Sequence, residues 1–195
     1  VVSGKIIGAE ALARWKRSDG TLIPPDQFIP LAERTGMIAA LDRCVISHAI
    51  ADLRALRKLE PAFVLSANTS AVTLSDLDLF DYLTGLMAMH RLDASALILE
   101  ITESQVLGKT ASLIETLCRL RLAGFELSID DFGTGHSNLA ALSEFPFTEL
   151  KIDRTFIMDA LTCNRANASV ESCLLLGREM AMHVADRCLQ LHGGY

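Results

Sequence analysis

The stretch Phe-Glu-Leu-Ser-Ile-Asp at residues 125–130 decides how this chain folds, because it alternates strictly between apolar and polar side chains. Successive residues of a β-strand face opposite ways, so Phe, Leu and Ile share one face while Glu, Ser and Asp share the other. The stretch lies in an apolar run, residues 125–132, and four more runs contain similar alternation. These are residues 5–15, 62–70, 96–104 and 148–156. We predict a strand in each of the five runs.

Segments with helical periodicity lie between the predicted strands. They cover residues 25–35, 38–59, 77–92, 106–123, 136–145 and 168–182. Strands and helices that alternate at this spacing indicate a mainly parallel sheet. The sequence contains no internal repeat, low-complexity tract or linker, so we predict a single domain over residues 1–195.

The polar faces of the predicted strands distinguish a closed barrel from an open sheet. An open sheet covered by helices on both sides needs two apolar faces. In a TIM-type barrel, one face meets the helices and the inward face positions functional groups at the C-terminal strand ends. Here the polar faces place five such residues towards those ends: Glu10, Asn68, Glu100, Asp130 and Lys151.

We therefore predict an α/β fold of the TIM-like (β/α) barrel type. A full barrel of this type needs about 250 residues. We expect this chain of 195 residues to hold an incomplete barrel and to be a fragment of a longer protein.

Charge and composition narrow the possible functions. A net charge of −6 at pH 7 offers no basic surface for a nucleic-acid polymer or an anionic membrane. The sequence shows no apolar run long enough for a membrane span and no signal-peptide pattern. Its five cysteines are far apart and form no CxxC pair, which argues against disulfides and zinc. We expect a cytoplasmic domain that makes no membrane contact itself, even if the parent protein is tethered to a membrane.

Oxygen donors at adjacent strand ends predict a site for hard divalent cations. Glu10, Asn68, Glu100 and Asp130 would suit Mg²⁺ or Mn²⁺ rather than zinc. Lys151 is out of place in a plain metal cage, but an ammonium can hold a phosphoryl oxygen or a nucleophilic water. The set predicts metal-assisted phosphoester hydrolysis, in which two cations about 3.5–4 Å apart hold the attacking and leaving oxygens. The alternative is that these residues are ordinary surface, ion-paired or capping groups.

Six motifs in this order resemble the EAL domain family, the bacterial cyclic di-GMP phosphodiesterases. They are EALARW at residues 10–15, FIPLAERTG at 28–36, SANTS at 66–70, LEITES at 99–104, LSIDDFGTG at 127–135 and ELKIDRTF at 149–156. LSIDDFGTG is the most specific of the six. Together they cover most of the chain at the family's ordinary spacing.

The resemblance implies a role for each matching position. Metal ligation is implied for Glu10, Asn68, Glu100, Asp130 and Asp131. Substrate contacts are implied for Leu12, Arg14, Pro146 and Asp153. Catalytic roles are implied for Lys151, Glu10, Asp131 and Asp186. Glu103 would anchor the loop at residues 131–137, which borders a dimer interface in relatives.

The C-terminal residues depart from the family pattern. Family members continue into a strand that reads roughly V-V-A-E-G-V-E, followed later by a Gln-Gly element. Residues 183–189 read HVADRCL, so Asp186 replaces the first Glu and Arg187 replaces the Gly. The last fifteen residues are instead similar to a helical segment of acyl-CoA dehydrogenases, but no flavin-binding pattern lies upstream. We expect a family pattern that is truncated at both ends and diverges after about residue 184.

The implied activity is hydrolysis of cyclic di-GMP to linear pGpG with Mg²⁺ or Mn²⁺, in a homodimer. Two alternatives remain open. A degenerate EAL domain would bind cyclic di-GMP as a receptor without cutting it, and a regulatory dimerisation module would do neither. Because Asp186 is one methylene shorter than Glu, we expect the chain as given to hydrolyse its substrate poorly or not at all.

Overall fold

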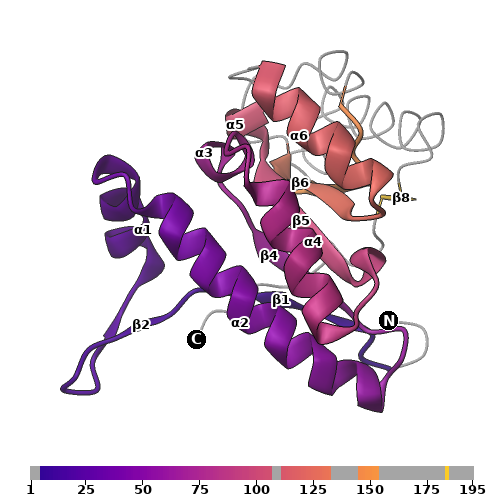
Figure 1. The fold of residues 1–195 in the computed structure, drawn as a ribbon. Coiled ribbons are helices and arrows are strands. Elements are labelled where there is room, and N and C mark those ends of the chain that lie inside the picture. Colours follow the sequence, from indigo (N-terminus) through magenta and orange to yellow (C-terminus); the bar gives the residue numbers. More distant parts are fainter. Residues whose placement is uncertain (1–4, 107–110, 133–144, 154–182, 185–195) are drawn as a thin grey trace, which may run out of the picture.

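The computed structural model describes residues 5–106, 111–132, 145–153 and 183–184 (Figure 1). Six strands form one parallel sheet: β1 (Gly8–Ala11), β4 (Val64–Asn68), β5 (Leu97–Thr102), β6 (Glu126–Phe132), β7 (Glu149–Ile152) and β8 (His183–Val184). Their order across the sheet is their order along the chain, which is the topology of a (β/α) barrel. The described residues therefore form part of a TIM-type barrel, as the sequence predicts.

The helices follow the strands in the predicted alternation. They are α1 (Pro25–Arg34), α2 (Ile38–Leu59), α3 (Ala71–Leu74), α4 (Leu79–His90), α5 (Glu103–Val106) and α6 (Ala111–Leu122), with a 3₁₀ turn, η1, at Ala94–Ala96. The longest helix, α2, has the predicted bounds. The short helices α3 and α5 were not predicted, because four residues are too few to show helical periodicity. The helices predicted at residues 136–145 and 168–182 lie almost wholly outside the described residues.

Local sequence explains how several helices begin and end. Pro25 occupies the first turn of α1, where a missing N–H costs nothing and the fixed φ favours the helix. Gly36 has a φ of +72° and so separates α1 from α2 in a backbone conformation that glycine adopts easily. Arg91 ends α4 with a φ of +56°, although it is not a glycine.

The prediction of one strand over residues 5–15 is wrong. Strand β1 ends at Ala11, and Trp15–Lys16 forms β2, which pairs with β3 (Leu22–Ile23) in a separate antiparallel hairpin. An Asp-Gly turn explains the change of direction, because the backbone N–H of Thr21 donates to Asp19 Oδ1 at 2.8 Å and Gly20 has a φ of +89°. Leu12 and Arg14 therefore follow the strand rather than belong to it.

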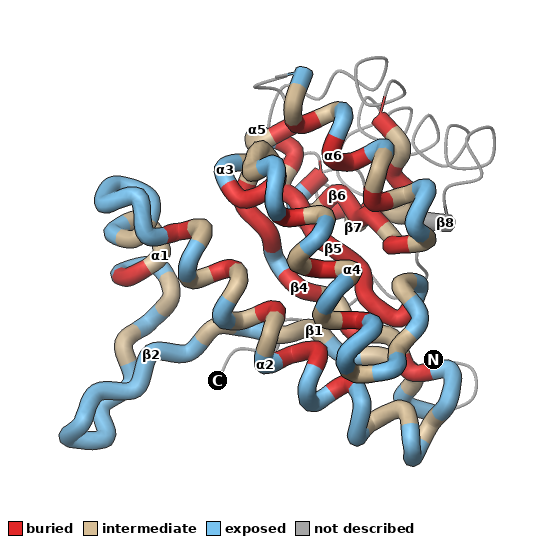
Figure 2. Tube along the Cα trace, in the orientation of Figure 1, coloured by how far each residue is buried: buried red, intermediate tan, exposed pale blue. Residues whose placement is uncertain are grey.

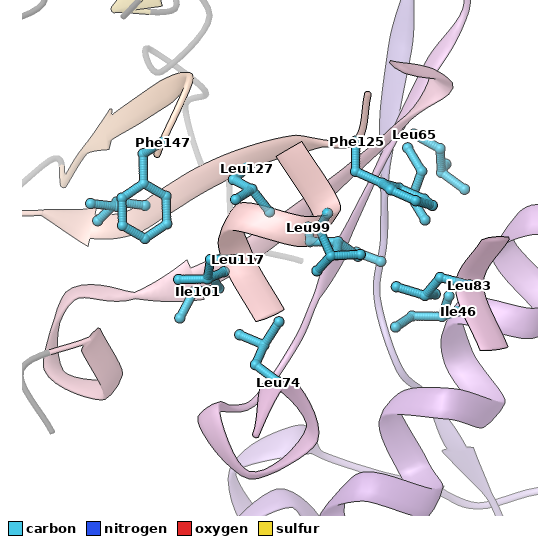
Figure 3. Close-up of a cluster of buried hydrophobic side chains, with 14 of the residues drawn as sticks. Ile46, Leu65, Leu74, Leu83, Leu99, Ile101, Leu117, Phe125, Leu127 and Phe147 are labelled. Carbon is cyan, nitrogen blue, oxygen red and sulfur yellow. The ribbon is translucent and has the colours of Figure 1, made fainter. Parts of the chain in front are cut away.

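The apolar core lies between the sheet and the helices α2, α4 and α6, which lie side by side (Figures 1 and 2). Leu65, Leu99 and Leu127 come from three neighbouring strands, and Ile46 and Leu117 come from the helices opposite (Figure 3). Each fully buried side chain of this size stabilises the fold by about 1.5–3 kcal/mol. The strand faces predicted to be apolar build this core in β4, β5, β6 and β7, whereas in β1 only Ala11 packs against the core and Ala9 is exposed.

The opposite strand faces are polar, although many of their residues are buried. Glu100 is 1% exposed and Ser128 is 0% exposed, and the two are direct partners in the pairing of β5 with β6. The inward face of the barrel therefore places a carboxylate where water has little access.

Within the described part of the chain, no helix is long and apolar enough to cross a membrane. Two of the five cysteines, Cys44 and Cys118, lie there as exposed free thiols. Their state agrees with the prediction of unpaired cysteines, and the other three lie outside the described residues.

Candidate active site

The predicted site residues meet at the C-terminal ends of neighbouring strands. Glu10 stands on β1 beside Ser66 of β4, and Asn68 at the end of β4 pairs with Glu100 of β5. Asp130 of β6 pairs with Thr102 of β5. Because all these strands are parallel, their side chains gather at one edge of the sheet.

Glu10 and Asn68 are in direct contact. The Asn68 amide Nδ2 donates a 2.8 Å hydrogen bond to Glu10 Oε1, across 58 residues of sequence. Glu10 is half-buried and Asn68 is exposed, so both side chains can reach a ligand at the edge of the sheet. The Asn68 amide oxygen remains available as an acceptor in this arrangement.

Glu100 and Lys151 form an ion pair inside the barrel. The Lys151 ammonium donates to Glu100 Oε1, and the side chains are 21% and 0% exposed respectively. Burial raises the pKa of Glu100, an effect that Lys151 partly offsets. Burial alone would lower the pKa of Lys151, but Glu100 above all, with Asp130 and Glu10, raises it overall. Lys151 is thus held as a cation by the carboxylates around it.

A β-bulge places two aspartates opposite this lysine. Between Ile129 and Phe132 the register of β6 against β7 shifts, so that Asp130 and Asp131 both face the single residue Lys151. Asp131 has a φ of +55°, a conformation that aspartate tolerates better than most residues. Bulges of this kind redirect side chains beside functional sites. The bulge therefore interrupts the strict alternation that would otherwise point the two carboxylates to opposite faces.

A cleft of about 500 Å³ opens beside these strand ends, within the range of small-molecule sites. It is lined by Leu12 and Arg14 after β1, by Asn68 and Glu100 at the strand ends, and by the first turns of α2. Leu12 and Arg14 are both exposed. The structure thus brings two predicted substrate contacts together with two predicted metal ligands.

The cleft also contains a buried carboxylate, Asp42 on α2, that sequence reasoning missed. Its Oδ2 accepts 2.9 Å and 2.6 Å hydrogen bonds from the Ser70 backbone N–H and the Thr73 hydroxyl. Ser70 in turn caps α3 by accepting from the Thr73 N–H at 3.2 Å. This network fixes the backbone two residues after Asn68. A lone Asp inside an amphipathic helix gives no sequence signal for such a contact.

The remaining predicted residues are dispersed. Glu103 is buried as the first residue of α5, directly after β5, and the Asp153 backbone N–H donates to the Phe132 carbonyl at 3.0 Å beyond the end of β7. Pro146 precedes β7 and is not among the residues that line the cleft. Asp186 lies outside the described residues.

The donors at the strand ends fit a hard divalent cation in their chemistry. Among the described residues no three His, Cys, Asp or Glu side chains are close enough to hold a metal ion as a group. Glu100 Oε2, however, is buried and makes no hydrogen bond to any described residue, which is costly for a carboxylate oxygen. A cation held by Glu100, Glu10 and the Asn68 oxygen would satisfy it.

The fold and the cleft define the class of protein, a TIM-type barrel with acidic and basic groups at its C-terminal strand ends. The model of the EAL domain family matches residues 1–186. The chain therefore belongs to the EAL domain family. The match ends close to the point where the sequence departs from the family pattern.

Two curated relatives are identical to this chain at about a third of the aligned positions. It is 37% identical over 183 residues to the bifunctional diguanylate cyclase/cyclic di-GMP phosphodiesterase MucR of Pseudomonas aeruginosa, covering 93% of this chain and 27% of MucR. It is 34% identical over 179 residues to the cyclic di-GMP phosphodiesterase RocR of the same organism, covering 92% of this chain and 46% of RocR. The chain thus spans less than half the length of these relatives.

Solved structures show the same fold. The PaMucR phosphodiesterase in complex with c-di-GMP matches with a TM-score of 0.81 and 37% identity, over 93% of this chain and 74% of that one. The EAL enzyme Bd1971 with cAMP and cyclic-di-GMP bound matches with a TM-score of 0.82 and 33% identity, over 93% and 50% of the two chains.

Proposed function

We propose that this domain hydrolyses cyclic di-GMP to linear pGpG by metal-assisted cleavage of one phosphodiester bond. The observation that supports this most is the meeting of Glu10, Asn68, Glu100 and Lys151 at one edge of the sheet, beside a cleft of ligand size. Relatives named as cyclic di-GMP phosphodiesterases, and a relative solved with c-di-GMP, support the choice of substrate.

In this proposal each site residue has a role that follows from its charge and its position. Arg14 and Leu12 would bind the dinucleotide at the mouth of the cleft, and Lys151 would orient the attacking water or stabilise the charge that develops on the phosphate. Glu10, Asn68, Glu100, Asp130 and Asp131 would hold one or two Mg²⁺ or Mn²⁺ ions. Such ions supply positive charge that polarises the phosphodiester when bound.

The test is formation of pGpG from cyclic di-GMP, measured by ion-exchange chromatography with Mn²⁺ or Mg²⁺ present. We expect turnover that is slow, because Asp186 stands where the family has Glu, and that Glu100→Gln abolishes, because the amide removes the buried negative charge. Thr84→Ala is the matched control, because this residue lies in α4 and does not line the cleft. No pGpG from the wild-type chain, even with tight cyclic di-GMP binding, would exclude hydrolysis by this chain.

A cyclic di-GMP receptor without turnover is the second candidate. The contacts that favour it are Lys151 on Glu100 and Asn68 on Glu10, because each gives a predicted metal ligand a partner within the protein. The replacement of the family's Glu by Asp186 points the same way. Saturable cyclic di-GMP binding by calorimetry, without pGpG formation, is the expected result for a receptor.

We further propose a homodimer in the cytoplasm. The support is the resemblance of the loop at residues 131–137 to a segment that borders the dimer interface of relatives, and most of this loop lies outside the described residues. Light scattering of the purified chain tests the proposal, and a monomeric mass at micromolar concentration would contradict it.

A further inference from the structure

A second pocket, of about 260 Å³, lies away from the candidate active site and is surrounded by basic side chains. Arg54, Arg57 and Lys58 come from the C-terminal part of α2, and His90, Arg91 and Asp93 come from the end of α4 and the residues after it. We call this the basic pocket. Arg54 lies nine residues after Val45, which lines the cleft, or about 14 Å further along the axis of α2.

The cations of the basic pocket have no carboxylate partners among the described residues, where no ion pair involves Arg54, Arg57, Lys58 or Arg91. Elsewhere in the same part of the chain, other cations do pair, including Arg43 with Asp76 at 2.7 Å and Arg121 with Glu126 at 3.1 Å. The basic pocket is therefore a concentration of positive charge on a chain whose net charge is −6.

This arrangement is unfavourable for the isolated domain. Arg54 lies three and four residues before Arg57 and Lys58 on the same helix, and like charges at these spacings destabilise a helix. Arg91 adopts a left-handed conformation with a φ of +56°, which costs an L-residue energy and which glycine usually occupies at a helix end. A binding site can explain why cations stand in both positions.

The partial charges of the helix ends explain only part of the cluster. Each helix C-terminus is equivalent to about half a negative charge, and its attraction for cations falls off within the last turn. Arg91 caps the C-terminus of α4, but Arg54 lies more than one turn from the end of α2. The pocket has four permanent cations, namely Arg54, Arg57, Lys58 and Arg91. Asp93 and the two helix ends together contribute about two negative charges, so a surplus of about two positive charges remains.

We propose that the basic pocket binds a doubly charged phosphate group, as free phosphate or as the terminal phosphate monoester of a nucleotide. The surplus charge matches that of a phosphate dianion, and guanidinium groups donate paired hydrogen bonds to phosphate oxygens. His90 also lines the pocket, and its Nδ1 is buried without a hydrogen-bond partner among the described residues. The site does not depend on hydrolysis at the cleft.

The test is calorimetric titration of the full chain at low ionic strength with inorganic phosphate and, separately, with 5′-GMP. We expect saturable binding with one site per chain, in the millimolar range. Tighter binding of GMP would assign the site to nucleotide monoesters, and equal affinities would assign it to phosphate alone.

Arg91→Gly is the decisive variant, because it removes the charge while suiting the left-handed backbone. We expect it to fold at least as stably as the wild type and to weaken phosphate binding about tenfold or more. Arg54→Ala should weaken binding to a similar extent. Arg34→Ala is the matched control, because Arg34 is also an exposed cation in the last turn of a helix, outside the basic pocket.

Two results would overturn the proposal. One is the absence of saturable binding of either anion by the wild-type chain. The other is equal binding by the wild type and by both pocket variants, because the anion would then sit elsewhere, for instance beside Lys151 in the cleft.

Discussion

Replacing Lys151 by methionine tests the ion pair at the centre of the candidate site. The Glu100 side chain is fully buried and receives its charged hydrogen bond from Lys151. Methionine keeps most of the apolar stem and removes only the ammonium. The variant therefore leaves a buried carboxylate without its cation, while packing changes little.

The expected loss of stability follows from this burial. Removing one partner of a buried ion pair costs about 3–5 kcal/mol. Because the side chain of Lys151 is still 21% exposed, we expect a loss of stability at the lower end of this range, about 3 kcal/mol. For a domain of this size each kcal/mol lowers Tm by about 2–4 °C, which gives a decrease of roughly 6–12 °C.

The assay is urea and thermal unfolding in EDTA, so that no divalent cation replaces the ammonium. The double variant Glu100→Gln with Lys151→Met should recover much of the loss, because a neutral amide needs no counter-ion. Lys16→Met is the control, since Lys16 is an exposed lysine on the hairpin and should change stability by less than about 0.5 kcal/mol. A loss below about 1 kcal/mol for Lys151→Met would refute the reasoning, because exposed pairs have that strength.

The same variant separates two roles of Lys151 in turnover. If the Lys151 cation acts on the developing charge, its removal lowers kcat far more than it weakens substrate binding. Equal losses in kcat and in affinity for cyclic di-GMP would instead identify Lys151 as a phosphate anchor.

Three other predictions follow from the site. Asp131→Gly should be more stable than Asp131→Ala by about 0.5–1 kcal/mol in denaturant unfolding. Both variants lose the carboxylate, but only alanine is strained at a φ of +55°. Equal stabilities of the two variants would contradict this prediction. Asp42→Ala should cost about 1–3 kcal/mol by leaving the buried Ser70 N–H without an acceptor, whereas Thr73→Val, which keeps that bond, should cost less by the same measurement. EDTA should abolish pGpG formation and Mn²⁺ should restore it, and turnover that survives EDTA would argue against a metal-dependent reaction.

The periodicity of the sequence determined much of the fold. Strict alternation at residues 125–130 predicted which face of β6 would join the apolar core, and the bounds of α2 at Ile38–Leu59 agree with its helical period. These features depend on neighbours a few residues apart, which a single sequence displays directly. The same alternation failed after Ala11, because Trp15 at the end of the predicted strand belongs to a separate hairpin, which turns at Asp19 and Gly20.

The sequence by itself also predicted that Glu10, Asn68, Glu100, Asp130 and Lys151 would share one edge of the sheet, because polar side chains at the C-terminal ends of parallel strands meet there. Only the tertiary structure decided how they pair. Lys151 contacts Glu100 across 51 residues, Asn68 contacts Glu10 across 58, and Asp42 reaches Ser70 across 28. The bulge at Asp130 and Asp131 and the clustering of Arg54 with Arg91 likewise appear only in the fold. Such contacts depend on the register of strands and the packing of helices, which bring together residues whose separation along the chain has no fixed period.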